Sequence, residues 1–203
     1  MKRVTEIVEM FWPYTIEDFR KFCDEKNVLY NTKLTPEEIE KWSSEFGTAM
    51  HEWCLLGKRP KEPTLLMGEC YNHWLTFVND TGLKILTAER KVMYEELYHG
   101  TLDAIVEMDG EIVLLDLKFW KCWYWEFLPQ EVPTELTMTS HKLAKANLQT
   151  YLYEKAQHDY DITARGVVAI NPLGLQFKIF RRSPRDKFEE AIKLLNKEQE
   201  NDF

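Results

Sequence analysis

Residues 100–119 constrain the fold of this 203-residue chain more strongly than any other stretch of the sequence. Within it, residues 102–108 and 112–119 are apolar runs typical of β-strands. Asp109-Gly110, which separates the two runs, is a strong signal for a two-residue turn between antiparallel strands. The sequence therefore predicts a β-hairpin in the middle of the chain.

The predicted hairpin carries two aspartates, a residue type that strand interiors disfavour. Asp103 lies near the start of the first strand and Asp116 near the end of the second, so closure of the turn brings their side chains together. Side chains alternate along a strand, which points Lys118 to the same face as Asp116. Neighbouring carboxylates repel each other unless a cation lies between them. Such a group commonly presents a divalent metal and a water nucleophile to a phosphate.

Composition places the chain among globular proteins. Apolar residues make up 44% of the sequence and aromatic residues 13%, which at this length is enough for one domain with a sizeable core. The four cysteines form no CxxC pair, which favours reduced thiols in the cytoplasm over disulfides or a zinc site. No apolar run reaches membrane-spanning length, and the first ten residues contain glutamates that a signal peptide lacks. We therefore expect a soluble, intracellular protein without membrane contact.

The charge distribution permits nucleic-acid binding on one face only. The formal net charge is −8, which counts against a strong grip on phosphates. Residues 141–187, however, hold nine Lys or Arg against four Asp or Glu, so the basic residues are segregated. This pattern predicts a basic face that binds DNA weakly and in a salt-sensitive way, unless a strand end or a partner adds affinity.

Helix and strand signals surround the hairpin. Thr35, Pro36 and Glu38 form a helix start with an N-cap, a first-turn proline and a capping box; the helix continues to Gly57, whole or divided after Ser43. Further helices are expected at 16–25, 63–77, 141–158 with Ser140 as cap, and after Ser183-Pro184 with Phe188, Ile192, Leu194 and Leu195 facing inward; further strands are expected at 85–93, 165–170 and 175–180.

This order of elements predicts an α/β fold with a mixed central sheet flanked by helices. We interpret residues 1–203 as a single domain. It comprises a helical extension at 1–40, a motif-bearing core at 41–160, and C-terminal strands and a helix at 161–203.

Five short motifs follow one another in this framework. They are Gly47-x-x-x-His51 in a helix, Glu89 in the strand before the hairpin, Gly100-x-x-Asp103 and Asp116-x-Lys118 in the hairpin, and Gln149-x-x-x-Tyr153 in the next helix. In type and order they resemble the PD-(D/E)XK nuclease superfamily, specifically its RecB-like branch of recombination and mitochondrial genome-maintenance exonucleases. The resemblance covers residues 43–153. It implies a restriction-endonuclease-like fold and metal-dependent hydrolysis of phosphodiester bonds.

The resemblance also implies roles for the matched residues around the metal. Asp103, Asp116 and the backbone carbonyl of Leu117 correspond to ligands of one or two Mg²⁺ or Mn²⁺ ions. Lys118 corresponds to the lysine that positions the attacking water or stabilises charge on the phosphate. His51 corresponds to a further metal ligand of this branch, and an imidazole makes Mn²⁺ a good alternative to Mg²⁺.

Other matched residues are implied to support catalysis and substrate binding. Glu89 corresponds to an acid that helps to hold a second ion or its waters. Gln149 and Tyr153 correspond to residues that orient the site and contact the nucleic-acid backbone. Lys142 and Lys145 share a helix stripe with them at three- and four-residue steps, which makes this stripe a candidate phosphate track.

Two departures from the family pattern limit what the resemblance implies. Iron-sulfur members of the branch carry a cysteine cluster after the last motif, whereas no cysteine follows Cys122 here, so we expect no iron-sulfur cluster. Phe119-Trp120 replaces the Thr or Ser that commonly follows the lysine, which leaves the substrate class open. The aromatic run at 119–127 fits core packing, a stacking platform for single-stranded bases, or a partner surface.

Each of these residues also has a plainer interpretation. Asp103 and Asp116 fit solvated strand ends, His51 a core histidine, and Glu89 an ion pair with a basic neighbour. Gln149 and Tyr153 fit packing against the sheet, and Lys142 and Lys145 a solvated helix face. We interpret the remaining histidines as incidental: His73, His99, His141 and His158.

We expect a Mg²⁺- or Mn²⁺-dependent deoxyribonuclease, acting as an exonuclease on single-stranded or duplex DNA ends in recombination, repair or phage DNA metabolism. One alternative is a structure- or sequence-directed endonuclease of the same fold. Another is a catalytically inactive nuclease fold that serves as a binding or inhibitory protein. A protein partner and a homo-oligomer both remain open at this point.

Overall fold

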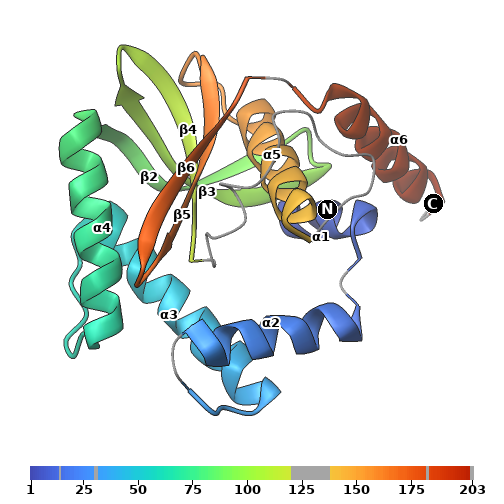
Figure 1. The fold of residues 1–203 in the computed structure, drawn as a ribbon. Coiled ribbons are helices and arrows are strands. Elements are labelled where there is room, and N and C mark those ends of the chain that lie inside the picture. Colours follow the sequence, from blue (N-terminus) through green and yellow to red (C-terminus); the bar gives the residue numbers. More distant parts are fainter. Residues whose placement is uncertain (14, 30–31, 120–137, 182, 202–203) are drawn as a thin grey trace.

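A mixed β-sheet with helices on both faces forms the centre of the protein (Figure 1). The computed structural model describes the chain except for residues 14, 30–31, 120–137, 182 and 202–203. The described strands are β1 (Lys2–Arg3), β2 (Lys84–Tyr94), β3 (Tyr98–Met108), β4 (Glu111–Lys118), β5 (Ala164–Asn171) and β6 (Gly174–Phe180). The described helices are α1 (Val4–Phe11), α2 (Ile16–Leu29), α3 (Pro36–Leu56), α4 (Leu65–Thr81), α5 (Met138–Ala156) and α6 (Arg185–Asn201). The predicted α/β architecture with a mixed, helix-flanked sheet is confirmed.

The sheet has a gap along one edge of β3. β2, β3, β4, β5 and β6 lie in this order, antiparallel except for the parallel pair of β4 and β5. β2 runs along one edge of β3, so β1 and β4 share the other edge. β1 pairs with residues 98–99 and β4 with residues 104–108. Within the described chain, residues 100–103 therefore have no strand neighbour on that edge.

The central hairpin closes as predicted. Asp109 and Gly110 have φ angles of 52° and 78°, the left-handed conformations that a two-residue type I′ turn requires. Their side chains suit this turn because Gly has no Cβ and Asp tolerates positive φ. The turn sets the strand register, which pairs Met108 with Glu111 and Ala104 with Leu115. The next position along the hairpin places Asp103 opposite Asp116.

The capping residues predicted from the sequence are confirmed for α3, whereas the cap predicted for α5 is wrong. The Thr35 hydroxyl accepts a hydrogen bond from the Glu38 amide, and the Glu38 carboxylate accepts one from the Thr35 amide. The helix is continuous and ends at Gly57, which has φ of 68°. The prediction for Ser140 is wrong, because α5 begins at Met138 and Ser140 lies inside it.

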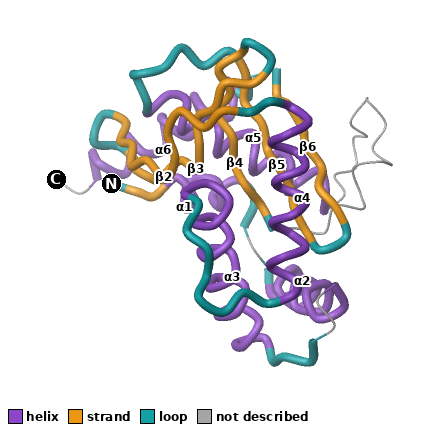
Figure 2. The backbone as a smooth tube through the Cα atoms, turned by 90° about the vertical axis from the view of Figure 1, so that its left-hand side faces the viewer, coloured by secondary structure: helices purple, strands orange, loops and turns teal. Residues whose placement is uncertain are grey.

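The two ends of the chain also depart from the sequence prediction. β1 and α1 were not predicted, and β1 joins the sheet through β3. In α6 the inward placement of Leu194 is wrong, because it is exposed while Leu195 is buried. α2 packs against α3, and together they extend beyond the sheet (Figure 1, Figure 2). Short-range sequence patterns therefore predicted the positions of the main helices and strands better than they predicted the contacts made by the two chain ends.

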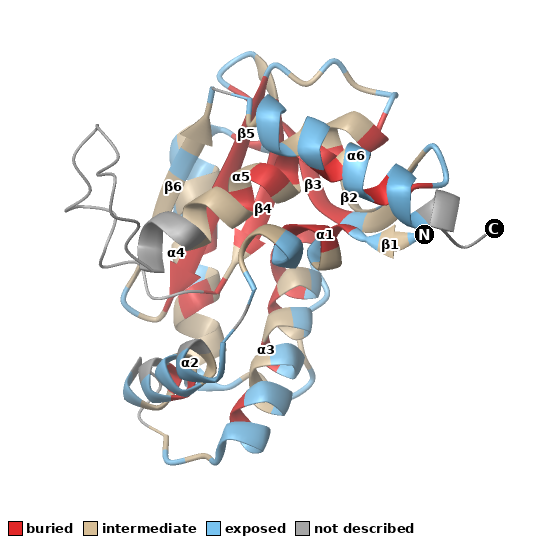
Figure 3. Cartoon of the chain, turned by 90° about the vertical axis from the view of Figure 1, so that its right-hand side faces the viewer, coloured by how far each residue is buried: buried red, intermediate tan, exposed pale blue. Residues whose placement is uncertain are grey.

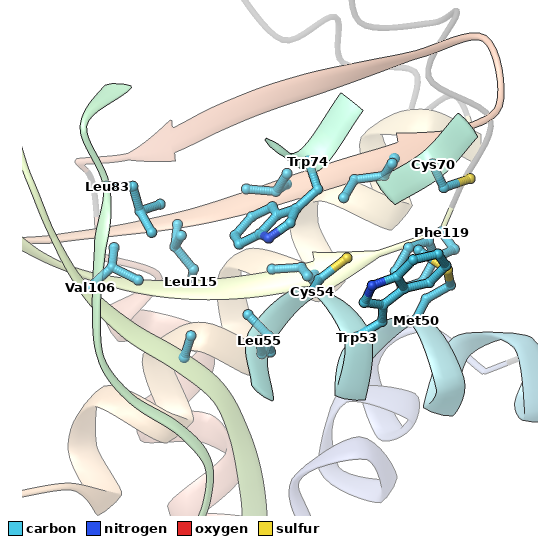
Figure 4. Close-up of a cluster of buried hydrophobic side chains, with 14 of the residues drawn as sticks. Met50, Trp53, Cys54, Leu55, Cys70, Trp74, Leu83, Val106, Leu115 and Phe119 are labelled. Carbon is cyan, nitrogen blue, oxygen red and sulfur yellow. The ribbon is translucent and has the colours of Figure 1, made fainter. Parts of the chain in front are cut away.

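Two apolar clusters fill the spaces on either side of the sheet. The first lies between the sheet and α3 and α4, and Figure 4 shows it reaching from Leu83 and Val106 to Phe119. The second lies between the sheet and α1, α5 and α6, and α5 directs its buried side towards the strands (Figure 3). In the described part of the chain, no helix combines the length and apolar character needed to cross a membrane.

Candidate functional site

The site lies where β3 and β4 separate. Their pairing ends at Ala104 and Leu115, whereas β4 remains paired with β5 as far as Lys118. Beyond Leu115, β4 therefore keeps β5 as a partner on one edge and, among the described strands, has no partner on the edge that faces β3. A buried backbone N–H or C=O group needs a hydrogen bond, so side chains must take the place of the missing strand pairing.

The backbone of Leu117 receives these side-chain partners. Its N–H donates to Oδ2 of Asp103 over 2.7 Å. Its carbonyl oxygen, the atom predicted as a metal ligand, lies 3.1 Å from Nε2 of His51, which reaches the strand from α3. Leu117 therefore links the hairpin carboxylate to the helix histidine.

His51 makes two polar contacts that require a charged ring. Its Nδ1 lies 3.1 Å from Oε1 of Glu89 and 3.8 Å from Oδ1 of Asp103. Nδ1 faces the Glu89 carboxylate and Nε2 faces the Leu117 carbonyl oxygen. Both groups are acceptors, so both contacts are hydrogen bonds only if both ring nitrogens carry protons. Burial lowers the pKa of His51, but the hydrogen bond to Glu89 and the charge of Asp103 outweigh it, and the net pKa is raised. The carboxylates thus favour a positive charge between them.

Glu89 reaches this site through a local distortion of β2. Its φ of 50° is unusual for a non-glycine residue within a strand and costs roughly 1 kcal/mol or more. Ala88 packs towards the first apolar cluster, whereas Val92 packs in the second. On β3, Ala104, which pairs with Ala88, lies in the first cluster, whereas Leu102 lies in the second. On both strands, side chains that strict alternation would put on one face of the sheet therefore lie on opposite faces before and after the site.

Asp116 and Lys118 form the second half of the site. Lys118 Nζ donates to Asp116 Oδ1 over 2.8 Å, which confirms that the two side chains share a face. Asp116 is 1% exposed, and its Oδ2 has no hydrogen-bond partner among the described residues. Burial opposes charge on Lys118, but Asp116 and Asp103 raise its pKa overall. The ammonium therefore stays protonated beside a buried carboxylate oxygen that is available to another cation.

Three side chains at the site lie close enough together to hold a metal ion. One atom each from His51, Glu89 and Asp103 lies within 4.8 Å of the others. Burial and the nearby Asp116 raise the pKa of Asp103 to about 7. The positive charge of the surrounding side chains therefore does not offset the cost of ionising Asp103. Carboxylate and carbonyl oxygens with a single imidazole are a donor set that Mg²⁺ and Mn²⁺ accept.

Asp116 does not belong to that close group of three, although the sequence paired it with Asp103 as the main metal carboxylates. Its charge acts on Asp103, but its direct contact is with Lys118. The group of three instead joins Asp103 to Glu89 and His51, 14 and 52 residues earlier in the chain.

Tyr153 and Gln149 of α5 border the site. Gln149 Nε2 lies 3.5 Å from the Tyr153 hydroxyl. Burial and the charge of Asp116 raise the pKa of Tyr153 to about 12, which keeps the phenol protonated. A Cβ atom on Gly100 would lie 2.7 Å from the Tyr153 ring. The absence of a side chain at Gly100 therefore leaves room for the Tyr153 ring.

The predicted phosphate track on α5 runs from two half-buried lysines to a buried tyrosine. Lys142 and Lys145 are half-buried on the helix that also carries Gln149 and Tyr153. Tyr153 is almost fully buried and belongs to the second apolar cluster. The stripe predicted from residue spacing therefore ends in the core at Tyr153.

Lys26 of α2 is a contact that sequence reasoning missed. Its Nζ donates to the backbone carbonyl of Phe119 over 2.8 Å, and both residues are buried. The Phe119 ring lies 5.7 Å from the His51 ring between centroids. Phe119 is thus core, whereas Trp120 and the rest of the aromatic run lie outside the described residues. A lysine in a polar helix gives no sequence signal for such a contact.

A cleft of about 490 Å³ opens beside the close group of three. His51 and Glu89 line it together with Gly47, Thr48 and Lys58. Gly47 lies inside α3, and no atom lies within 4 Å of the position a Cβ would take. Glycine weakens a helix interior by about 1 kcal/mol relative to alanine, yet protein packing does not require it here. Its effect is to widen the cleft next to His51.

Comparison of the chain with models of known protein families found no match, and a search of curated proteins also found none. The function is therefore inferred from the geometry described above.

Proposed function

We propose that this protein is a metal-dependent nuclease that hydrolyses phosphodiester bonds in DNA. The observation that carries the proposal is the convergence on Leu117, where Asp103, His51 and the Asp116–Lys118 pair meet at the end of the β3–β4 ladder. The order of motifs supports a restriction-endonuclease-like fold of the RecB-like branch. The proposed mode is exonuclease action on DNA ends in recombination, repair or phage DNA metabolism.

The proposed metal ligands come from four segments of the chain. His51, Glu89, Asp103 and the Leu117 carbonyl would hold a Mg²⁺ or Mn²⁺ ion, with Asp116 Oδ2 available to it or to a second ion. When bound, the ion would lower the pKa of a water molecule and offset the negative charge of the phosphate. The proton shared between His51 and its acceptors would leave as the ion binds, because a metal-ligating imidazole is neutral at the ligating nitrogen.

Lys118 would act on the reacting atoms. Its ammonium is anchored by Asp116 over 2.8 Å, which leaves N–H groups for the attacking water or for a phosphate oxygen. A donor that is already in place when charge develops stabilises the transition state without further reorganisation. Tyr153, hydrogen-bonded to Gln149, borders the same space and would restrict the position of the strand.

The test is cleavage of four DNA substrates, linear and covalently closed, each single- and double-stranded, with Mg²⁺, Mn²⁺ or EDTA. The expected result is metal-dependent loss of linear DNA only. Cleavage of closed circles would replace the exonuclease proposal by an endonuclease of the same fold. Failure on all substrates, combined with normal Mn²⁺ binding by calorimetry, would identify a catalytically inactive binding protein. Failure of both would overturn the proposed function.

A further inference from the structure

A second cavity, of about 630 Å³, has Tyr153 among its lining residues, the same tyrosine that borders the candidate site. The other lining residues come from the N-terminus, β1, α1, β2 and β3. Three basic side chains line it: Arg3, Lys91 and His99. No Asp or Glu is among its described lining residues, although the protein as a whole carries a net charge of −8. The cavity is therefore a basic site in an acidic protein.

Two of these basic groups are available to a ligand. Lys91 and His99 make no ion pair or side-chain hydrogen bond with the described residues, and Lys91 is exposed. Arg3 is held by Glu6, whose carboxylate lies 2.9 Å from Arg3 Nε and outside the cavity lining. Two buried apolar residues, Val4 and Val92, also line the cavity. Apolar walls with a few converging polar groups are typical of a small-ligand pocket.

The strand register places this cavity next to the proposed reaction centre. Lys91 pairs with Thr101 across β2 and β3. Each lies two residues from a proposed metal ligand, Glu89 and Asp103 respectively, or about 7 Å along an extended strand. Each strand of a B-form duplex rises about 3.4 Å per nucleotide along the axis, and adjacent phosphates lie farther apart than this because the strand also winds, so the offset is on the scale of neighbouring nucleotides. A strand whose scissile phosphate lies at the metal ligands therefore has a neighbouring phosphate within reach of the cavity.

We propose that this cavity is a phosphate-binding subsite for the DNA strand, in which Lys91 and His99 hold a phosphate one or two nucleotides from the cleaved bond. Thr101, which also lines the cavity, carries a hydroxyl that is a further hydrogen-bond donor. The inference rests on the proposed nuclease function for its substrate. The phosphate is either an internal one or the phosphate at a strand terminus, because both present the same oxygens.

The experiment compares the double variant Lys91→Gln/His99→Gln with Lys84→Gln. Lys84 lies on the same strand but pairs with Glu107 and does not line the cavity, so its variant controls for the loss of charge. Binding of a labelled oligodeoxynucleotide in EDTA is measured by fluorescence anisotropy over a range of salt concentrations. Cleavage with Mn²⁺ is measured on oligonucleotides with a terminal phosphate or a terminal hydroxyl.

The double variant is expected to bind about tenfold more weakly, with a salt slope smaller by about one to two and an unchanged melting temperature. Its KM should rise by a similar factor while kcat stays the same, and Lys84→Gln should match the wild type in all respects. A defect confined to phosphorylated ends assigns the site to a terminal phosphate, and an equal defect on both ends assigns it to an internal one. Unchanged binding and KM in the double variant would overturn the subsite.

The same measurements separate this inference from the proposed function. If the wild type cleaves DNA but the double variant behaves like the wild type, the subsite alone is wrong. If the wild type binds without cleaving and the double variant loses binding, the subsite stands and the nuclease activity is wrong.

Discussion

The two ends of the β3–β4 hairpin differ in strand pairing and in the side chains that they bury. At the turn end the two strands are fully paired, and residues 105, 106 and 113–115 are completely buried. At the open end, one residue beyond the last pair, Asp103 and Asp116 replace the apolar side chains, and β4 loses its partner on the β3 side. The candidate site lies where the strand pairing stops.

The difference follows from how each end satisfies its backbone. At the turn end, N–H and C=O groups bond across the strands, and no polar side chain is needed. At the open end, the N–H and C=O of Leu117 are satisfied by Asp103 and His51 instead. A break in strand pairing thus draws polar side chains into an otherwise apolar layer, and these side chains form the candidate metal site.

The largest expected effect is on activity at the open end. Asp116→Asn removes the negative charge that anchors Lys118, and it also replaces one carboxylate oxygen, so that Oδ2 is no longer available to a cation. The cleavage rate should therefore fall about a thousandfold with the fold retained. Initial rates in Mn²⁺ and a circular dichroism spectrum measure both quantities. Glu107→Gln, a carboxylate change at the turn end of β3, should leave the rate unchanged. Wild-type turnover in Asp116→Asn would remove Asp116 from the site.

At the turn end the expected effect is on stability. Leu115→Ala empties a fully buried position and should lower the free energy of unfolding by about 2–5 kcal/mol in urea titrations. The rate per folded molecule at low temperature should stay within about threefold of the wild type. A much larger loss of rate would show that the apolar end also shapes the reaction centre.

The open end should also make stability depend on pH in EDTA. The folded-state pKa of Asp103, about 7, exceeds its ordinary value of 3.8, and the pKa of His51 is also raised. Both groups therefore stabilise the fold at low pH, and this stability is lost as pH rises through their folded-state pKa values.

Urea unfolding should accordingly show a loss on the order of 2 kcal/mol between pH 5 and pH 8 in EDTA. Asp103→Asn should reduce this loss, and millimolar Mn²⁺ should stabilise the protein more at pH 8 than at pH 5 because it competes with protons. Stability that rises with pH in EDTA would contradict the assigned environment of Asp103.

The smallest expected effect concerns the cleft beside the open end. Gly47→Leu should fill part of the cleft and slow DNA cleavage about tenfold, with an equal or higher melting temperature because leucine favours a helix. Gly68→Leu in α4 is a matched control, since Gly68 is also a helical glycine with no atom near its Cβ position. Equal rates for both variants would show that the strand does not pass Gly47.

Short-range physics made much of the fold predictable from the sequence. Asp109-Gly110 specified the turn, the turn set the register, and alternation placed Lys118 beside Asp116. Thr35 and Gly57 marked the two ends of α3 through capping interactions within one helical turn. Each of these outcomes depends on residues that are close in the chain.

Contacts between distant segments were decided only by the tertiary structure. Glu89 meets His51 because β2 adopts a positive φ at that residue, and a glutamate gives no sequence signal for this conformation. Lys26 bonds to the Phe119 carbonyl across 93 residues, which depends on how α2 packs beyond the sheet. The sequence by itself determined which groups are available near the hairpin. The packing of the helices and the point at which the strands separate decided which of them meet, because those distances depend on the whole fold.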